Sequence, residues 1–175
     1  METKMKTGST TRKIVCLALL GLSLAGCDSD SSDSSIQPKA IERPYTIIAI
    51  PDTQVYSEED NLTPIFKNQV EWVLENRSKE NIVFTTHLGD VVDNGDSQNQ
   101  WDNALKALDS FFKAPADFVY SISQGNHDGV DLFTKYLGPE RYSGKSWYIG
   151  ASPNKLNHAQ TFKVEHRTFL HINLQ

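Results

Sequence analysis

The stretch Ile82-Val83-Phe84-Thr85-Thr86-His87-Leu88-Gly89-Asp90-Val91-Val92-Asp93-Asn94 joins an apolar run directly to an acidic loop. The run is short and rich in β-branched residues, which predicts a buried strand. Two other stretches repeat the arrangement: residues 45–50 lead into Asp52-Thr53-Gln54, and residues 118–123 lead into Gly125-Asn126-His127-Asp128. The sequence therefore predicts three strands, each followed at once by a polar cluster.

The segments between these strands have helical spacing. Residues 62–76 carry apolar side chains close to a helical period, and Asn61 or Thr63 can cap the helix. Residues 98–112 predict a second helix, with Trp101 on the apolar face that packs into the core. Alternating strands and helices predict a parallel sheet with right-handed crossovers.

The character of the chain changes after about residue 131. Strand-like pieces follow one another at residues 146–149, 160–165 and 168–174. The last two flank His166-Arg167 and predict a hairpin. An α/β half is thus expected to give way to antiparallel strands.

The three polar clusters are expected to meet in space, because the carboxyl ends of strands in an open α/β sheet line the crevice that binds ligands. Asp52 and Asp90 supply carboxylates, Gln54 and Asn126 supply amide oxygens, and His127 supplies an imidazole. An oxygen-rich set with some nitrogen and no thiolate suits Mn, Mg, Fe or Zn ions. Each cluster alone is a common turn, so the prediction depends on all three occurring at strand ends.

The chain contains Asp-x-Gln, then Gly-Asp-x-x-Asp-Asn-Gly, then Gly-Asn-His-Asp. This series resembles the motifs of calcineurin-like metallophosphoesterases. The sequence around Asp52, Pro51-Asp52-Thr53-Gln54, is similar to the exported bacterial branch of that family. The resemblance implies an α/β fold, here the N-terminal half of a four-layer α/β/β/α sandwich. It also implies hydrolysis of a phosphate ester, either a monoester or a diester, with two divalent metal ions as cofactors. The metal could be Mn, Fe, Zn or Mg, and the substrate cannot be read from the sequence.

The resemblance also implies a role for each matched residue. Asp52 and Gln54 would bind the first metal, Asp90 would bridge both metals, and Asn126 would bind the second. The family commonly has His where Gln54 stands, and an amide is a weaker ligand. His127 and Asp93 would be the catalytic pair, with His127 facing the phosphate and Asp93 orienting its imidazole.

The later histidines depart from the family pattern. The family completes its metal sites with downstream histidines, the last in Gly-His-x-His, whereas this chain offers His158, His166 and His171 outside that setting. We expect His166 at a turn and His171 in a strand, both in structural roles. The sequence stops at Gln175 directly after a strand, which we interpret as a truncated domain spanning residues 41–175. The alternative function is a non-catalytic surface lipoprotein on a truncated or degenerate scaffold.

The N-terminus is typical of an exported lipoprotein. A basic region precedes an apolar run over residues 14–25, and Leu24-Ala25-Gly26-Cys27 resembles a lipobox. We therefore predict a signal peptide at residues 1–26, then the acylated Cys27 and a Ser/Asp tether over residues 27–40. An ordinary cleaved signal is the alternative. The lipoprotein interpretation anchors the protein to a membrane of the bacterial cell envelope, facing the periplasm or exterior.

Composition sets broad limits on the partners of the chain. The 175 residues are 38% hydrophobic and 22% charged, as in globular proteins, with a formal net charge of −5. No basic surface that would indicate nucleic-acid binding is evident. The only cysteines are Cys16 and Cys27, so residues 28–175 contain none that could form a disulfide. The partners implied are a phosphate-ester substrate and a membrane, and the oligomeric state stays open.

Overall fold

A computed structural model describes residues 40–175 of the chain. The predicted signal peptide, most of the tether and the acylation at Cys27 lie outside these residues. The described elements, in chain order, are β1 (Thr46–Ile50), α1 (Gln54–Glu58), α2 (Thr63–Asn76), β2 (Ile82–His87), α3 (Gln98–Phe112), β3 (Tyr120–Ile122), α4 (Val130–Leu137), the 3-10 helix η1 (Pro139–Tyr142), β4 (Tyr148–Ala151), β5 (His158–Val164) and β6 (Arg167–Asn173).

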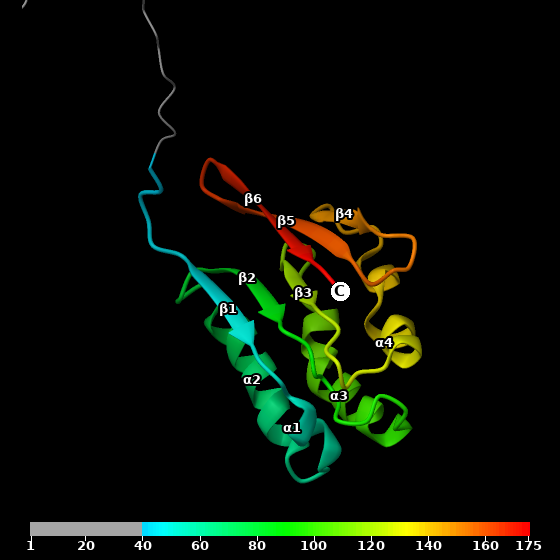
Figure 1. Ribbon diagram of the computed structural model, residues 1–175. Coiled ribbons are helices and arrows are strands. Elements are labelled where there is room, and N and C mark those ends of the chain that lie inside the picture. The colour runs from blue at the N-terminus through cyan, green and yellow to red at the C-terminus, as the bar shows by residue number, and fades with distance from the viewer. Residues whose placement is uncertain (1–39) are drawn as a thin grey trace, which may run out of the picture. The chain divides into compact units, whose positions relative to one another are not determined.

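The first three strands form one parallel sheet in the order β1-β2-β3. Ile48 on β1 pairs with Thr85 on β2, which in turn pairs with Tyr120 on β3. Helices α2 and α3 occupy the two crossovers, so the predicted α/β class with a parallel sheet is confirmed. The carboxyl ends of all three strands point to the same edge (Figure 1).

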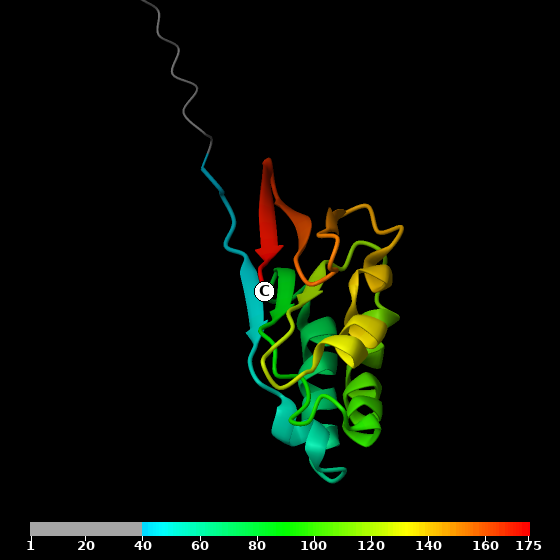
Figure 2. The same ribbon diagram turned by 45° about the vertical axis from the view of Figure 1, so that its right-hand side comes forward.

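The parallel sheet lies between helices and a second sheet, as both views show (Figures 1 and 2). On the helical side, Phe66 of α2 packs against His87, with ring centroids 5.8 Å apart. On the other side, Phe84 stacks on Phe162 of β5 at 4.7 Å. The resulting core includes Trp101, which is fully buried as predicted.

The second sheet is antiparallel, in the order β4-β5-β6. β5 and β6 form the predicted hairpin, although the turn falls at Glu165-His166 and not at His166-Arg167. Glu165 has φ of 52°, the left-handed conformation that a tight turn needs. Each of the three strands begins and ends within two residues of the predicted positions.

Several local predictions were wrong for identifiable reasons. Neither Asn61 nor Thr63 caps α2; the N-cap is Leu62, and the Thr63 hydroxyl donates to backbone carbonyls of the preceding turn. β3 is shorter than predicted because the amide of Phe118 bonds to the carbonyl of Pro115 in a turn. Helices α1 and α4 were not predicted, since five and eight residues are too few to show a clear period.

Within residues 40–175, none of the helices has the length and apolar character needed to cross a bilayer.

Candidate metal centre

The polar clusters follow β1, β2 and β3 at the shared carboxyl edge of the parallel sheet. Asp52 lies in the turn after β1, and Gln54 opens α1. Asp90 and Asp93 lie in the loop after β2. The loop after β3 carries Asn126 and His127. We call these the first, second and third loops.

Two side chains join the first loop to the strand and loop that follow it. The hydroxyl of Thr53 lies 2.9 Å from Nε2 of His87. His87 Nδ1 accepts from the amide of Gly89, so its ring proton lies on Nε2 and is donated to Thr53. In addition, Nε2 of Gln54 donates to Oδ1 of Asp93 at 3.1 Å. The amide oxygen of Gln54 is therefore the atom left for a ligand.

His87 is packed in the interior of the fold. Its side chain is 1% exposed, and burial lowers the pKa of His87 to about 4. The imidazole is therefore neutral near pH 7 and serves to hold the first loop against the sheet.

His127 joins the third loop to the second. Its backbone amide donates to Oδ1 of Asp90 at 3.0 Å, and its Nδ1 lies 2.9 Å from the carbonyl oxygen of Asp93. A carbonyl only accepts, so Nδ1 carries a proton. That hydrogen bond raises the pKa of His127, and the carboxylates of Asp90, Asp93 and Asp128 add to the effect. The Asp93 carboxylate lies 3.3 Å from the same nitrogen.

Asp128 makes a contribution that the sequence did not reveal. Its carboxylate is fully buried and links two loops. Oδ1 accepts from the amides of Val91 at 2.7 Å and Val92 at 3.0 Å, and Oδ2 accepts from Gly125 at 2.7 Å. Burial raises the pKa of Asp128 to about 6, while these three hydrogen bonds act in the opposite direction.

Two glycines allow the second and third loops to touch. A Cβ on Gly125 would lie 2.1 Å from both N and Oδ1 of Asp90, and one on Gly89 would lie 2.7 Å from the Gly125 nitrogen. These contacts show that the two glycines leave room for the neighbouring backbone and the Asp90 carboxylate.

The donor atoms of this cluster fit a divalent cation in part. Within residues 40–175, neither the Asp52 carboxylate, the second Asp90 oxygen nor the Asn126 amide has a hydrogen-bond partner, so their oxygens remain available. Carboxylate and amide oxygens are suitable ligands for hard divalent ions. However, no group of three or more His, Cys, Asp or Glu side chains in the described part is placed to hold a metal. Two of the four predicted ligands are amides, which explains the small number of stronger donors.

The three later histidines have other contacts. His158 is 4% exposed, and its Nδ1 lies 2.6 Å from Nε2 of Gln160. His171 packs its ring against Phe84 at 4.7 Å. His166 lies at the β5–β6 turn, with Nδ1 3.9 Å from the Glu165 carboxylate.

A buried polar network supports the strand that leads into the third loop. β3 is an edge strand, and side chains satisfy its outer backbone groups. The amide of Ile122 donates to the Tyr142 hydroxyl at 3.1 Å, and Nε2 of His158 lies 3.3 Å from the Ile122 carbonyl. Asn173 bonds to the hydroxyls of Ser121 and Ser123. No motif indicated Tyr142 or Asn173, because their partners lie far away in sequence.

A parallel sheet that gathers carboxylates, amides and a histidine at the carboxyl ends of its strands has the arrangement in which open α/β sheets bind ligands. Residues 45–172 match the family model described as calcineurin-like phosphoesterase, and the chain belongs to this family. It is similar to an uncharacterized protein, YvnB, of Bacillus subtilis strain 168, with 33% identity over 120 residues. The match covers 65% of this chain and 9% of YvnB, so the chain spans a small part of that relative. No solved structure matches the chain.

Proposed function

We propose that this chain carries the metal-binding part of a metal-dependent phosphoester hydrolase. Membership of the calcineurin-like phosphoesterase family supports hydrolysis of phosphoric esters as the reaction class, and such proteins generally use divalent metals. The observation that carries the proposal is the joining of all three loops by Gln54–Asp93 and Asp90–His127 hydrogen bonds. Residues separated by dozens of positions thus converge on one edge of the sheet.

The proposed metal ligands are the oxygen donors that face this edge. Asp52 and Gln54 would hold the first ion, Asp90 would contact both ions, and Asn126 would hold the second. When bound, divalent ions would lower the pKa of coordinated water. Their positive charge would also stabilise the phosphate oxygens. Because the Gln54 nitrogen is already bonded to Asp93, this side chain is oriented to offer its oxygen.

His127 is the proposed proton donor to the leaving oxygen. Its Nδ1 is fixed by Asp93, which leaves Nε2 as the atom that can reach a substrate. The raised pKa of His127 favours the protonated ring that a general acid requires. Asp93 is the positioning residue of this pair, and it acts through its backbone carbonyl as well as its carboxylate.

A second candidate function is metal or ligand binding without turnover, on a non-catalytic surface lipoprotein. The small number of strong donors in the described part favours it, because weak coordination lowers both affinity and the power to activate water. His158 and His171, which follow the third loop, are engaged in interior packing and hydrogen bonds.

Manganese binding and turnover by the full 175-residue chain separate the two candidates. We would follow Mn²⁺ by electron paramagnetic resonance and assay one chromogenic phosphomonoester and one phosphodiester. Asp90→Asn should remove both binding and hydrolysis, whereas Asp109→Asn, which changes a carboxylate paired with Lys113 on α3, should remove neither. Binding without turnover would support the second candidate. Absence of Mn²⁺ binding would contradict both.

We also propose that the protein is anchored in the bacterial cell envelope through lipid on Cys27. The support is the lipobox-like Leu24-Ala25-Gly26-Cys27 after a basic and apolar leader. Labelled palmitate should enter the wild-type protein and Cys16→Ser, but not Cys27→Ser. Equal labelling of Cys27→Ser would refute the anchor.

A further inference from the structure

The second loop is held in place by the first turn of α3, the helix that follows it in the chain. Oε1 of Gln100 accepts from the amide of Asp93 at 2.9 Å and from the amide of Asn94 at 2.7 Å. The indole N–H of the next residue, Trp101, donates to the carbonyl of Gly95 at 2.8 Å. Two adjacent side chains of the helix therefore fix three consecutive residues of the loop.

The side chain of Gln100 is not needed to begin the helix. The N-cap of α3 is Ser97, whose side-chain oxygen accepts from the backbone amide of Gln100 at 3.5 Å. The Gln100 side chain turns to the second loop instead and is 8% exposed. Its amide oxygen has two lone pairs, and the amides of Asp93 and Asn94 use both. This oxygen is therefore committed to the backbone of the loop.

The backbone of Asp93 passes this constraint on to His127. The Asp93 amide is held by Gln100, and the Asp93 carbonyl accepts from Nδ1 of His127 at 2.9 Å. Only two soft dihedrals separate the amide of a residue from its carbonyl, so fixing the first restricts the direction of the second. Gln54 restrains the same residue through its bond to the Asp93 carboxylate.

We propose that Gln100 is a positioning residue that sets which nitrogen of His127 carries the proton, through the backbone of Asp93. The side chain of His127 is 39% exposed, so packing alone does not hold its ring. A carbonyl aimed at Nδ1 favours the neutral tautomer with the proton on that nitrogen and leaves Nε2 free. The consequence for catalysis rests on the proposed function, in which Nε2 of His127 faces the leaving oxygen.

Two substitutions separate the acceptor oxygen of Gln100 from the shape of the side chain. Gln100→Met keeps the length but offers only a weakly accepting sulfur, whereas Gln100→Glu keeps an oxygen that accepts from both amides. The full 175-residue chain is studied without metal or substrate, at a pH high enough to make the ring of His127 neutral. A long-range ¹H–¹⁵N correlation spectrum then identifies the protonated nitrogen, and His127→Gln assigns its signals.

We expect the Nδ1–H form to dominate in the wild type and in Gln100→Glu. In Gln100→Met the ratio of the Nδ1–H form to the Nε2–H form should fall about fivefold, the effect of one typical hydrogen bond. The amides of Asp93 and Asn94 should also exchange faster with solvent. An unchanged ratio in Gln100→Met, or a lowered ratio in Gln100→Glu, would overturn the proposal. If Gln100→Met does not fold, the ratio in Gln100→Glu decides.

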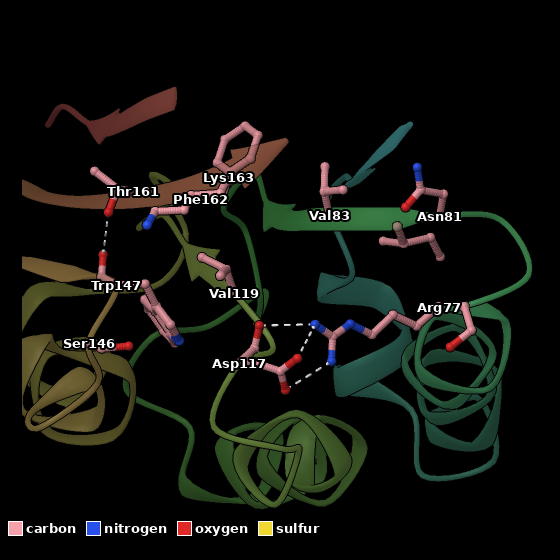
Figure 3. A pocket seen from close by; sticks show the side chains of 12 residues that line it. Arg77, Asn81, Val83, Asp117, Val119, Ser146, Trp147, Thr161, Phe162 and Lys163 are labelled. Atoms are coloured by element: carbon pink, nitrogen blue, oxygen red, sulfur yellow. Dashed lines mark hydrogen bonds and ion pairs between the residues drawn. The ribbon is translucent and has the colours of Figure 1, made fainter. Parts of the chain in front are cut away.

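Two controls separate positioning from a general loss of stability. Gln98→Met makes the same change at an exposed side chain that is bonded to Asp102 and Tyr136. Arg77→Met removes a contact between the end of α2 and Asp117, which precedes β3 at the opposite end of the sheet (Figure 3). Neither control should alter the tautomer ratio, and a fall in either would refute the assignment. Because no metal or substrate is present, the result is separate from that of the hydrolase assay.

Discussion

His158 makes the free energy of unfolding depend on pH. The side chain is 4% exposed and stacks on Tyr142 at 5.2 Å, and burial lowers the pKa of His158 to about 4 from 6.5. Since the folded pKa is below the unfolded one, the unfolded chain binds more protons in between. The stabilisation is therefore complete above pH 6.5 and is lost as the pH falls through 6.5 towards 4.

The size of the effect follows from these two values. At pH 5 the unfolded chain holds nearly one proton at His158 and the folded chain holds almost none, so the free energy of unfolding is about 2 kcal/mol lower than at pH 7. His87, whose pKa also falls to about 4 through burial, adds a similar amount. The two histidines together lower the free energy of unfolding by about 4 kcal/mol between pH 7 and pH 5, and Asp128, whose pKa is raised to about 6, offsets about 1 kcal/mol of this loss.

Urea unfolding at pH 7, 6 and 5, followed by far-ultraviolet circular dichroism, measures this dependence. His158→Gln should be less stable at pH 7, because it loses the ring stacking, but it should lose about 2 kcal/mol less than the wild type on going to pH 5. Lys163→Gln, on the same strand, removes a charge from an exposed position and should parallel the wild type. If His158→Gln kept the full pH dependence of the wild type, the reasoning about His158 would be wrong.

Three further changes test the loops and the surface. Asp128→Asn should lower the free energy of unfolding by about 1–3 kcal/mol in urea, because at least one of three buried amide donors loses its acceptor. Gly125→Ala should lower Mn²⁺ affinity at least about tenfold by calorimetry, since the new Cβ displaces Asp90; Gly144→Ala, with nothing within 4 Å, should keep the affinity. Arg77→Ala should cost less than about 1 kcal/mol in thermal unfolding, since its partner Asp117 is exposed to solvent, which weakens the ion pair.

The convergence of the three loops could be predicted from the sequence because each loop has a recognisable local pattern. A β-branched run ending in Asp or Gly-Asp is a local pattern, and the parallel topology then places the strand ends together. The contacts that hold the loops in place could not be predicted in this way. Asp128 accepts hydrogen bonds from the amides of Val91 and Val92, more than thirty positions earlier. No local pattern indicates which amides will face a buried carboxylate.

The fold was predictable to the same extent and for the same reason. Helix α3 has the predicted bounds because its apolar face is long enough to show a period and Ser97 caps it. Helix α2 was predicted from residue 62 and begins at Thr63, but it lacks a side-chain cap, so the predicted cap at Asn61 or Thr63 was wrong. The prediction for β3 was too long mainly because its apolar residues begin at Phe118, two residues before the pairing with β2 starts.

The buried carboxylate of Asp128 also constrains the order in which the protein can fold. Its acceptors are satisfied only when the loop after β2 and the loop after β3 are both in place, so neither loop can acquire its final conformation alone. The amides of Val91, Val92 and Gly125 are therefore expected to open to solvent as one unit, with matching hydrogen-exchange protection. The proposed metal site would then form or open as a whole, because its second and third loops depend on the same buried carboxylate.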